Sequence, residues 1–186
     1  ISDTPEAEPS KLLKGQAGTS LDISILKNDE SAPKTIHLKR ETVQINNVIY
    51  SGIIRPGVGY ISLEEFNASA TKELKSALST LKQAGMQKLI LDLRENPGGL
   101  LTQAVDICNL FLAKETKIVE TRGKVEEWNK TYTALNTSFD SDIPLIILIN
   151  GHSASAAEIV AGVMQDYDRA VLIGKKSYGK GLVQVT

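Results

Sequence analysis

Near the end of the chain, a serine and a lysine have side chains suited to nucleophilic catalysis. Ser155 lies in a run of small residues (N-G-H-S-A-S-A-A-E, 150–158), Lys180 lies 25 positions later between two glycines, and Gln184 follows four positions after that. A serine hydroxyl becomes a nucleophile only when a base takes its proton. Because the chain has only two histidines, lysine is a candidate for that base.

The two histidines do not fit a histidine-based site. His37 lies in an alternating stretch that predicts a surface strand position. His152 precedes Ser155 by three residues, across a sharp turn, and a base must come within about 2.6–3.2 Å of the hydroxyl. The G-x-S-x-G elbow and the H-E-x-x-H zinc motif are both absent. The sequence therefore predicts neither a histidine triad nor a metal site.

A lysine can act as the base if its amine is neutral. The free pKa of lysine is about 10.4, and burial away from carboxylates lowers it toward about 7–8. The glycines beside Lys180 leave room for close approach, and Gln184 would hold the amine without adding charge. Ser155, Lys180 and Gln184 can thus serve as nucleophile, base and support.

The same residues also fit structural roles. Ser155 and Glu158 form the S-x-x-E pattern of a helix capping box, and Lys180 fits a solvated lysine in a glycine turn. The string G-K-K-S-Y-G-K at 174–180 begins like a phosphate-binding loop, but Gly181 stands where serine or threonine should bind magnesium. Pattern alone leaves the cap and the nucleophile both open.

Hydrophobic periodicity predicts the elements that would position these residues. A small β-rich unit is expected from strands at 20–26, 34–40 and 41–48, and a second region alternates strands and helices. That order predicts an α/β fold with a mainly parallel sheet flanked by helices. The second region has expected strands at 58–66, 88–94, 117–123, 126–135, 144–150, 170–174 and 182–185, and helices at 68–86, 100–112 and 153–167.

Composition excludes several classes of protein. The 186 residues are 41% hydrophobic and 23% charged with a formal net charge of −1, which gives no electrostatic argument for nucleic acid or membrane surfaces. The apolar run at 144–150 is too short to span a bilayer, and the first residues do not form a signal peptide. Cys108 is the only cysteine, so it forms no internal disulfide, and we expect it to be a small core residue of a helix.

Four strings together resemble the carboxy-terminal processing peptidases, also called tail-specific proteases. They are GYISLEEF, LILDLRENPGGL, SASAAEIVAGVMQD and IGKKSYGKGLVQ, which occur in order between Gly59 and Gln184. The resemblance implies that Ser155 is the nucleophile, Lys180 its base and Gln184 the support of the lysine. It also implies a crotonase-like α/β core, in agreement with the predicted order of strands and helices.

The expected oxyanion hole uses two backbone N–H groups. One belongs to Ala156, which follows the nucleophile, and the other comes from the N-P-G-G turn, where the resemblance favours Gly99 over Gly98. No cofactor is required. The resemblance further implies polypeptide substrates cut near their C-terminal tails, a homo-oligomer or an accessory adaptor as partner, and a place in the bacterial cell envelope or periplasm.

The front of the chain resembles part of the same family. The string S-K-L-L-K-G-Q-A-G-T at 10–19, followed by two strands, is similar to the C-terminal half of a PDZ domain. We therefore expect a partial PDZ domain over 1–48 and a peptidase core over 49–186 that is truncated at its C-terminus. The predicted function is a serine endopeptidase; the alternative is a non-catalytic crotonase-fold module that binds peptides or ligands.

Overall fold

The computed structural model describes residues 12–26, 28, 31–42 and 46–183. The chain divides into two compact units, Ile1–Ile45 and Asn46–Thr186. The division falls three residues before the boundary expected from the sequence.

The first unit contains an antiparallel pair of strands. β1 (Ser20–Ile25) pairs with β2 (Lys34–Lys39), with Ser20 opposite Lys39. The guanidinium of Arg40 donates hydrogen bonds to the carbonyls of Leu12 and Leu13 (3.1 and 2.9 Å) and so joins the strand pair to the helical residues 12–13. These two strands are confirmed. The expected strand at 41–48 is not: residues 41, 42, 46 and 47 are not in a strand, and 43–45 lie outside the described residues.

The second unit is built on a five-stranded, mainly parallel sheet. β3 (Val48–Arg55) runs antiparallel to β4 (Val58–Leu63), while β4, β5 (Lys88–Asp92), β8 (Leu145–Ile149) and β9 (Val171–Gly174) are parallel, in the order β3-β4-β5-β8-β9. The mainly parallel sheet predicted from the sequence is confirmed.

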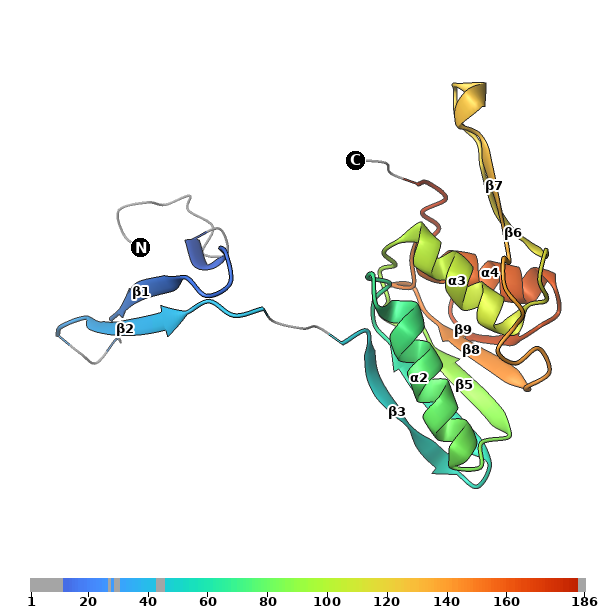
Figure 1. Cartoon of the computed structure of the whole chain (residues 1–186), viewed down its shortest axis with the longest axis horizontal. Coiled ribbons are helices and arrows are strands. Elements are labelled where there is room, and N and C mark those ends of the chain that lie inside the picture. The colour runs from blue at the N-terminus through green and yellow to red at the C-terminus, as the bar shows by residue number, and fades with distance from the viewer. Residues whose placement is uncertain (1–11, 27, 29–30, 43–45, 184–186) are drawn as a thin grey trace. The chain divides into compact units, whose positions relative to one another are not determined.

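Helices connect the parallel strands. α2 (Ala70–Gln83), α3 (Leu101–Phe111) and α4 (Ala156–Asp166) follow β4, β5 and β8. Each crossover moves in the same direction across the sheet, so the right-handed rule places these helices on one face, where Figure 1 shows α2 lying over the strands. The alternation along β4 agrees, because Ile61 and Leu63 are fully buried whereas Tyr60 and Ser62 on the opposite face are half-buried.

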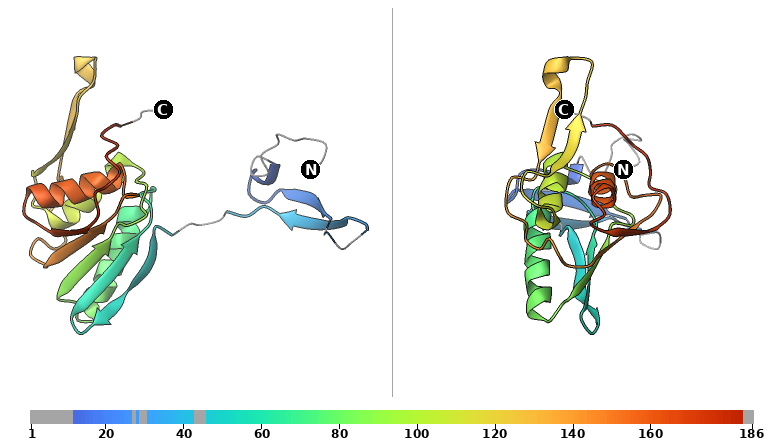
Figure 2. Two further views of the ribbon diagram at one scale, coloured as in Figure 1. Left: turned by 180° about the vertical axis from the view of Figure 1, so that it is seen from behind. Right: turned by 90° about the vertical axis from the view of Figure 1, so that its right-hand side faces the viewer.

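A two-stranded excursion leaves this core between α3 and β8. β6 (Lys117–Thr121) pairs antiparallel with β7 (Lys130–Thr133), and a short 3-10 helix (Glu126–Trp128) joins them. Figure 2 shows the pair projecting from the core unit. The strand expected at 126–135 is therefore shorter than predicted, since residues 126–128 form the 3-10 helix and only Lys130–Thr133 are in a strand.

Two further differences from the expected elements concern the edges of the sheet. Val48–Arg55 is a full strand, although Ser51 and Gly52 weaken its strand pattern. Residues 182 and 183 of the expected last strand are not in a strand, and 184–185 lie outside the described residues. No helix in the described parts of the chain is long and apolar enough to cross a membrane.

Candidate active site

Three loops meet at the carboxyl ends of the parallel strands. Residues 93–99 follow β5, residues 150–155 follow β8, and residues 175–180 follow β9. Loops at this edge are where open parallel sheets place their ligand sites. Ser155, Gly99 and Lys180 each come from a different one of these loops.

Ser155 occupies the turn between β8 and α4 in a strained conformation. Its φ of 53° and ψ of −114° lie outside the regions that a residue with a Cβ normally adopts. Such strain in a non-glycine residue costs about 1–3 kcal/mol and clusters at functional sites. The strand–turn–helix geometry is that of a nucleophile elbow, although the sequence lacks the elbow's G-x-S-x-G string.

The loop after β5 packs directly against this turn. A Cβ on Gly98 would lie 2.8 Å from Ser155 Cβ and 2.9 Å from the nitrogen of Ala156. The hydroxyl of buried Ser153 donates to the carbonyl of Leu93 (2.7 Å), and the N–H of Ala154 donates to the carbonyl of Asn96 (3.0 Å). The N-P-G-G turn is thus held beside the candidate nucleophile.

Two backbone N–H groups at this junction have no hydrogen-bond acceptor among the described residues. The N–H of Gly98 donates to Asn96 Oδ1 at 2.8 Å. Within the described residues, the N–H groups of Gly99 and Ala156 donate to no other group. Ala156 is also the first residue of α4, where the helix dipole favours negative charge. The predicted oxyanion donors are therefore brought to the same junction as Ser155.

Lys180 reaches the site through its backbone. Its N–H donates to Glu158 Oε2 at 3.0 Å, and the same oxygen accepts the N–H of Ser155 at 2.8 Å. The Lys180 side chain is exposed, so the burial expected for a lysine base is not found in this chain. Leu182 and Val183, which follow it, are exposed as well. Gln184 lies outside the described residues.

Glu158 joins the turn of Ser155 to the loop of Lys180. Its Oε1 accepts the Ser177 hydroxyl (2.8 Å) and the N–H of Gly179 (2.6 Å), in addition to the two bonds on Oε2. Burial opposes ionisation of this carboxyl, but these hydrogen bonds outweigh it and lower the pKa of Glu158 below its ordinary value. The capping-box pattern identified Glu158 only as a partner of Ser155.

Among the described residues, His152 makes no hydrogen bond to Ser155. Its Nδ1 is bonded to Glu95 Oε2, and Asn150 Nδ2 donates to Glu95 Oε1 at 2.5 Å. These contacts join the loops after β5 and β8 at the exposed surface.

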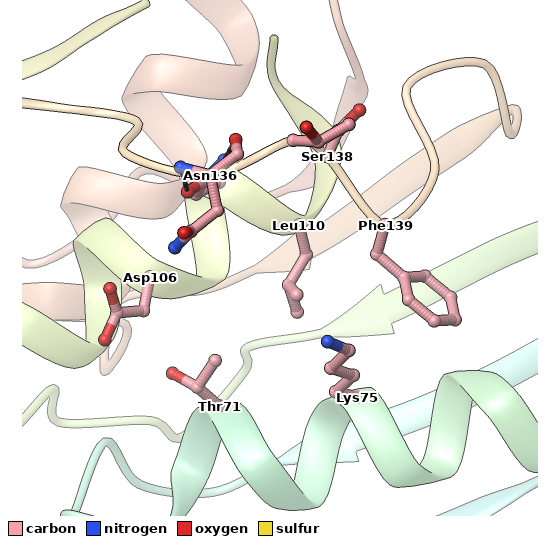
Figure 3. Close-up of a pocket in the computed structure, with 9 residues that line it drawn as sticks. Thr71, Lys75, Asp106, Leu110, Asn136, Ser138 and Phe139 are labelled. Carbon is pink, nitrogen blue, oxygen red and sulfur yellow. Dashed lines mark hydrogen bonds between the residues drawn. The ribbon is translucent and has the colours of Figure 1, made fainter. Parts of the chain in front are cut away.

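A pocket in the same unit lies apart from this constellation. It has a volume of about 510 Å³ and is formed between α2, α3 and residues 136–139, as Figure 3 shows. Neither Ser155 nor Lys180 lines it. Its lining residues are Thr71, Lys75, Asp106, Asn109, Leu110, Asn136, Thr137, Ser138 and Phe139. Among the described residues there is also no group of three or more histidines, cysteines or carboxylates that could hold a metal ion.

Comparisons with known proteins find relatives that match most of this chain. A carboxyl-terminal-processing protease of Synechocystis sp. is 40% identical over 180 residues, which are 95% of this chain and 42% of that protein. A probable CtpA-like serine protease of Staphylococcus epidermidis is 38% identical over 178 residues, 95% of this chain and 35% of its own. The chain thus spans less than half the length of these relatives.

A solved structure shares the fold. The photosystem II D1 C-terminal processing protease superposes with a TM-score of 0.66 and 28% sequence identity, over 92% of this chain and 47% of its own. The model of Peptidase family S41 matches residues 57–186, which include all three loops of the site. The chain therefore belongs to Peptidase family S41.

Proposed function

We propose that the intact protein carrying this chain is a serine endopeptidase that cleaves polypeptides near their C-terminus. The observation that carries the proposal is the junction of three loops at Ser155. There a strained serine, two N–H groups that donate to no described residue, and the backbone of Lys180 are held together. Membership of Peptidase family S41 and the names of the relatives support the reaction class.

In this proposal Ser155 and Lys180 form the reacting pair. Neutral Lys180 Nζ takes the proton of Ser155 Oγ, which attacks the scissile carbonyl and forms a tetrahedral intermediate. The N–H groups of Ala156 and Gly99 stabilise the oxyanion. Lys180 then protonates the leaving amine, and water hydrolyses the acyl-enzyme. Gln184 would hold the amine of Lys180 in position.

The test uses the intact protein and three variants. Ser155→Ala and Lys180→Ala should each lower cleavage of a peptide substrate by at least about 10³-fold, because each removes a reacting group. Lys176→Ala is the matched control, since Lys176 is an exposed lysine of the same loop that takes no part in the proposed reaction. Undiminished cleavage by the Ser155 or the Lys180 variant would disprove the assignment.

Covalent labelling separates the peptidase from a non-catalytic binding module. A fluorophosphonate should attach to Ser155 of the intact protein with loss of fluoride, and a peptide map should locate the adduct. The Ser155→Ala variant should take up no label there. A binding module would bind peptide without labelling at Ser155.

We also propose roles for the first unit and for the setting of the protein. The β1–β2 pair following helical residues 12–13 would be the second half of a PDZ domain that captures substrate tails. The protein would act in the bacterial envelope or periplasm, alone, as a homo-oligomer or with an adaptor. Cell fractionation with a periplasmic marker tests the location, and activity in the cytoplasmic fraction alone would contradict it.

A further inference from the structure

A buried asparagine holds the N-P-G-G turn through both the nitrogen and the oxygen of its side-chain amide. Asn96 is fully buried. Its Nδ2 donates to the carbonyl of Leu63 at the end of β4 (2.7 Å), and its Oδ1 accepts the N–H of Gly98 (2.8 Å). Its own carbonyl accepts the N–H of Ala154 (3.0 Å), one residue before the candidate nucleophile. One side chain thus joins the end of β4 to the turn that faces Ser155.

This arrangement decides which glycine N–H is available. The N–H of Gly98 is occupied by Asn96, and the carbonyl of Gly98 accepts the N–H of Phe66 at 2.9 Å. The described peptide bonds are all trans, and in a trans peptide the C=O and the following N–H point in opposite directions. The N–H of Gly99 therefore points away from the N–H of Phe66, and it donates to no described residue.

We propose that Asn96 is a positioning residue that makes Gly99, and not Gly98, the second oxyanion donor. It does so by engaging the Gly98 N–H and by fixing the turn to β4, which leaves the Gly99 N–H to act with that of Ala156. The inference rests on the proposed peptidase function. It assigns Asn96 no contact with the substrate.

Asn96→Ala in the intact protein tests the role of the side chain. The variant frees the Gly98 N–H and releases the turn, so kcat should fall about 10²–10³-fold, the loss observed when one oxyanion donor is removed. KM should change less than about threefold, because the oxyanion contact strengthens only in the transition state. A kcat within about threefold of the parent would overturn the proposal.

Asn109→Ala is the matched control for the loss of a buried asparagine whose side-chain amide makes two hydrogen bonds to the backbone. Asn109 is also buried, its Nδ2 donates to the carbonyl of Asn136 (2.6 Å), and its Oδ1 accepts the N–H of Asn136 (2.8 Å). It lines the pocket of Figure 3, away from the loops of the site. Its variant should lose thermal stability and keep the parental kcat; an equal fall in kcat in both variants would reduce Asn96 to a structural role and refute the proposal.

The unmodified protein offers a second measurement that does not depend on a variant folding. A crystal structure after fluorophosphonate treatment should place the phosphonyl oxygen about 2.7–3.1 Å from the nitrogens of Gly99 and Ala156, with the Gly98 N–H still on Asn96. A phosphonyl oxygen on the Gly98 N–H would overturn the proposal while supporting the peptidase. Failure of the protein to label at Ser155 would instead count against the proposed function itself, and the inference built on it would fall too.

Discussion

The backbone N–H groups of Ser155 and Lys180 donate to the same atom, Oε2 of Glu158, at 2.8 and 3.0 Å. The two residues are 25 positions apart and lie on loops after different strands. Their main chains are therefore held by one carboxylate group, whose other oxygen binds Ser177 and Gly179. Any change at Glu158 should alter the relative placement of the serine and the lysine.

Glu158→Gln should lower kcat about ten- to hundredfold. The amide nitrogen of glutamine cannot accept the N–H groups that one carboxylate oxygen now binds. Hydrogen bonds to charged groups contribute about 1.5–3 kcal/mol, and each 1.36 kcal/mol is about tenfold in rate. Peptide cleavage by the purified variant, with KM and kcat determined separately, checks this expectation.

Glu73→Gln is the control for that substitution. Glu73 is a carboxylate of the first turn of α2 that likewise accepts several hydrogen bonds, from the N–H groups of Asn47 and Val48 and from the Ser69 hydroxyl. Its loss should destabilise the attachment of β3 to α2 without changing kcat. If both variants lost activity equally, Glu158 would have no special part in holding the loops of Ser155 and Lys180.

The sequence allowed the sheet to be predicted because its parallel strands are buried. LILDL and LIILI are nearly continuous apolar runs that only a covered strand tolerates. β3 was not predicted as a strand because an edge strand need not bury its side chains and so carries no strict apolar pattern. Ile49 is 58% exposed and Ile54 is 46% exposed. Edge strands leave a weak pattern for this reason.

The candidate site was predictable only in part. The serine, its following alanine and the glycine turn are local in sequence, so spacing and resemblance could single them out as candidates. The roles of Asn96 and Glu158 depend on contacts with residues as far away as Leu63 and Lys180, and no local pattern encodes such contacts. The capping box was the one local signal for Glu158.

Acid should lower the free energy of unfolding partly through protonation of Glu158. Since the pKa of this carboxyl in the folded state lies below the ordinary value of 4.5, its contribution to the free energy of unfolding is complete above about pH 4.5 and is lost as the pH falls through the lower folded-state value. Urea unfolding of the intact protein and of Glu158→Gln should give a stability difference at pH 6 that shrinks toward pH 3. A difference independent of pH would contradict this linkage.

Cys108 should be inert to thiol reagents in the folded protein. Its side chain is completely buried, and burial raises the pKa of the thiol far above its usual range, which leaves almost no reactive thiolate. An aromatic disulfide reagent should modify it at the rate of unfolding in buffer and within seconds to minutes in concentrated urea. Cys108→Ser serves as the blank. Rapid modification under native conditions would show that this part of α3 opens readily.

Gly98→Ala should abolish most of the activity, while Gly162→Ala should leave it unchanged. Gly98 has a φ of 101°, and a Cβ there would lie 2.7 Å from the carbonyl oxygen of Ala154, so the turn must move away from Ser155. Displacements of about 1 Å in a site cost about 10²-fold in rate, and we expect at least that loss in kcat.

In contrast, a Cβ on Gly162 would meet nothing within 4 Å. Because alanine is favoured over glycine by about 0.8–1.0 kcal/mol inside a helix, Gly162→Ala in α4 should raise the melting temperature. Equal activities of the two variants would show that the N-P-G-G turn need not lie against Ser155 for catalysis.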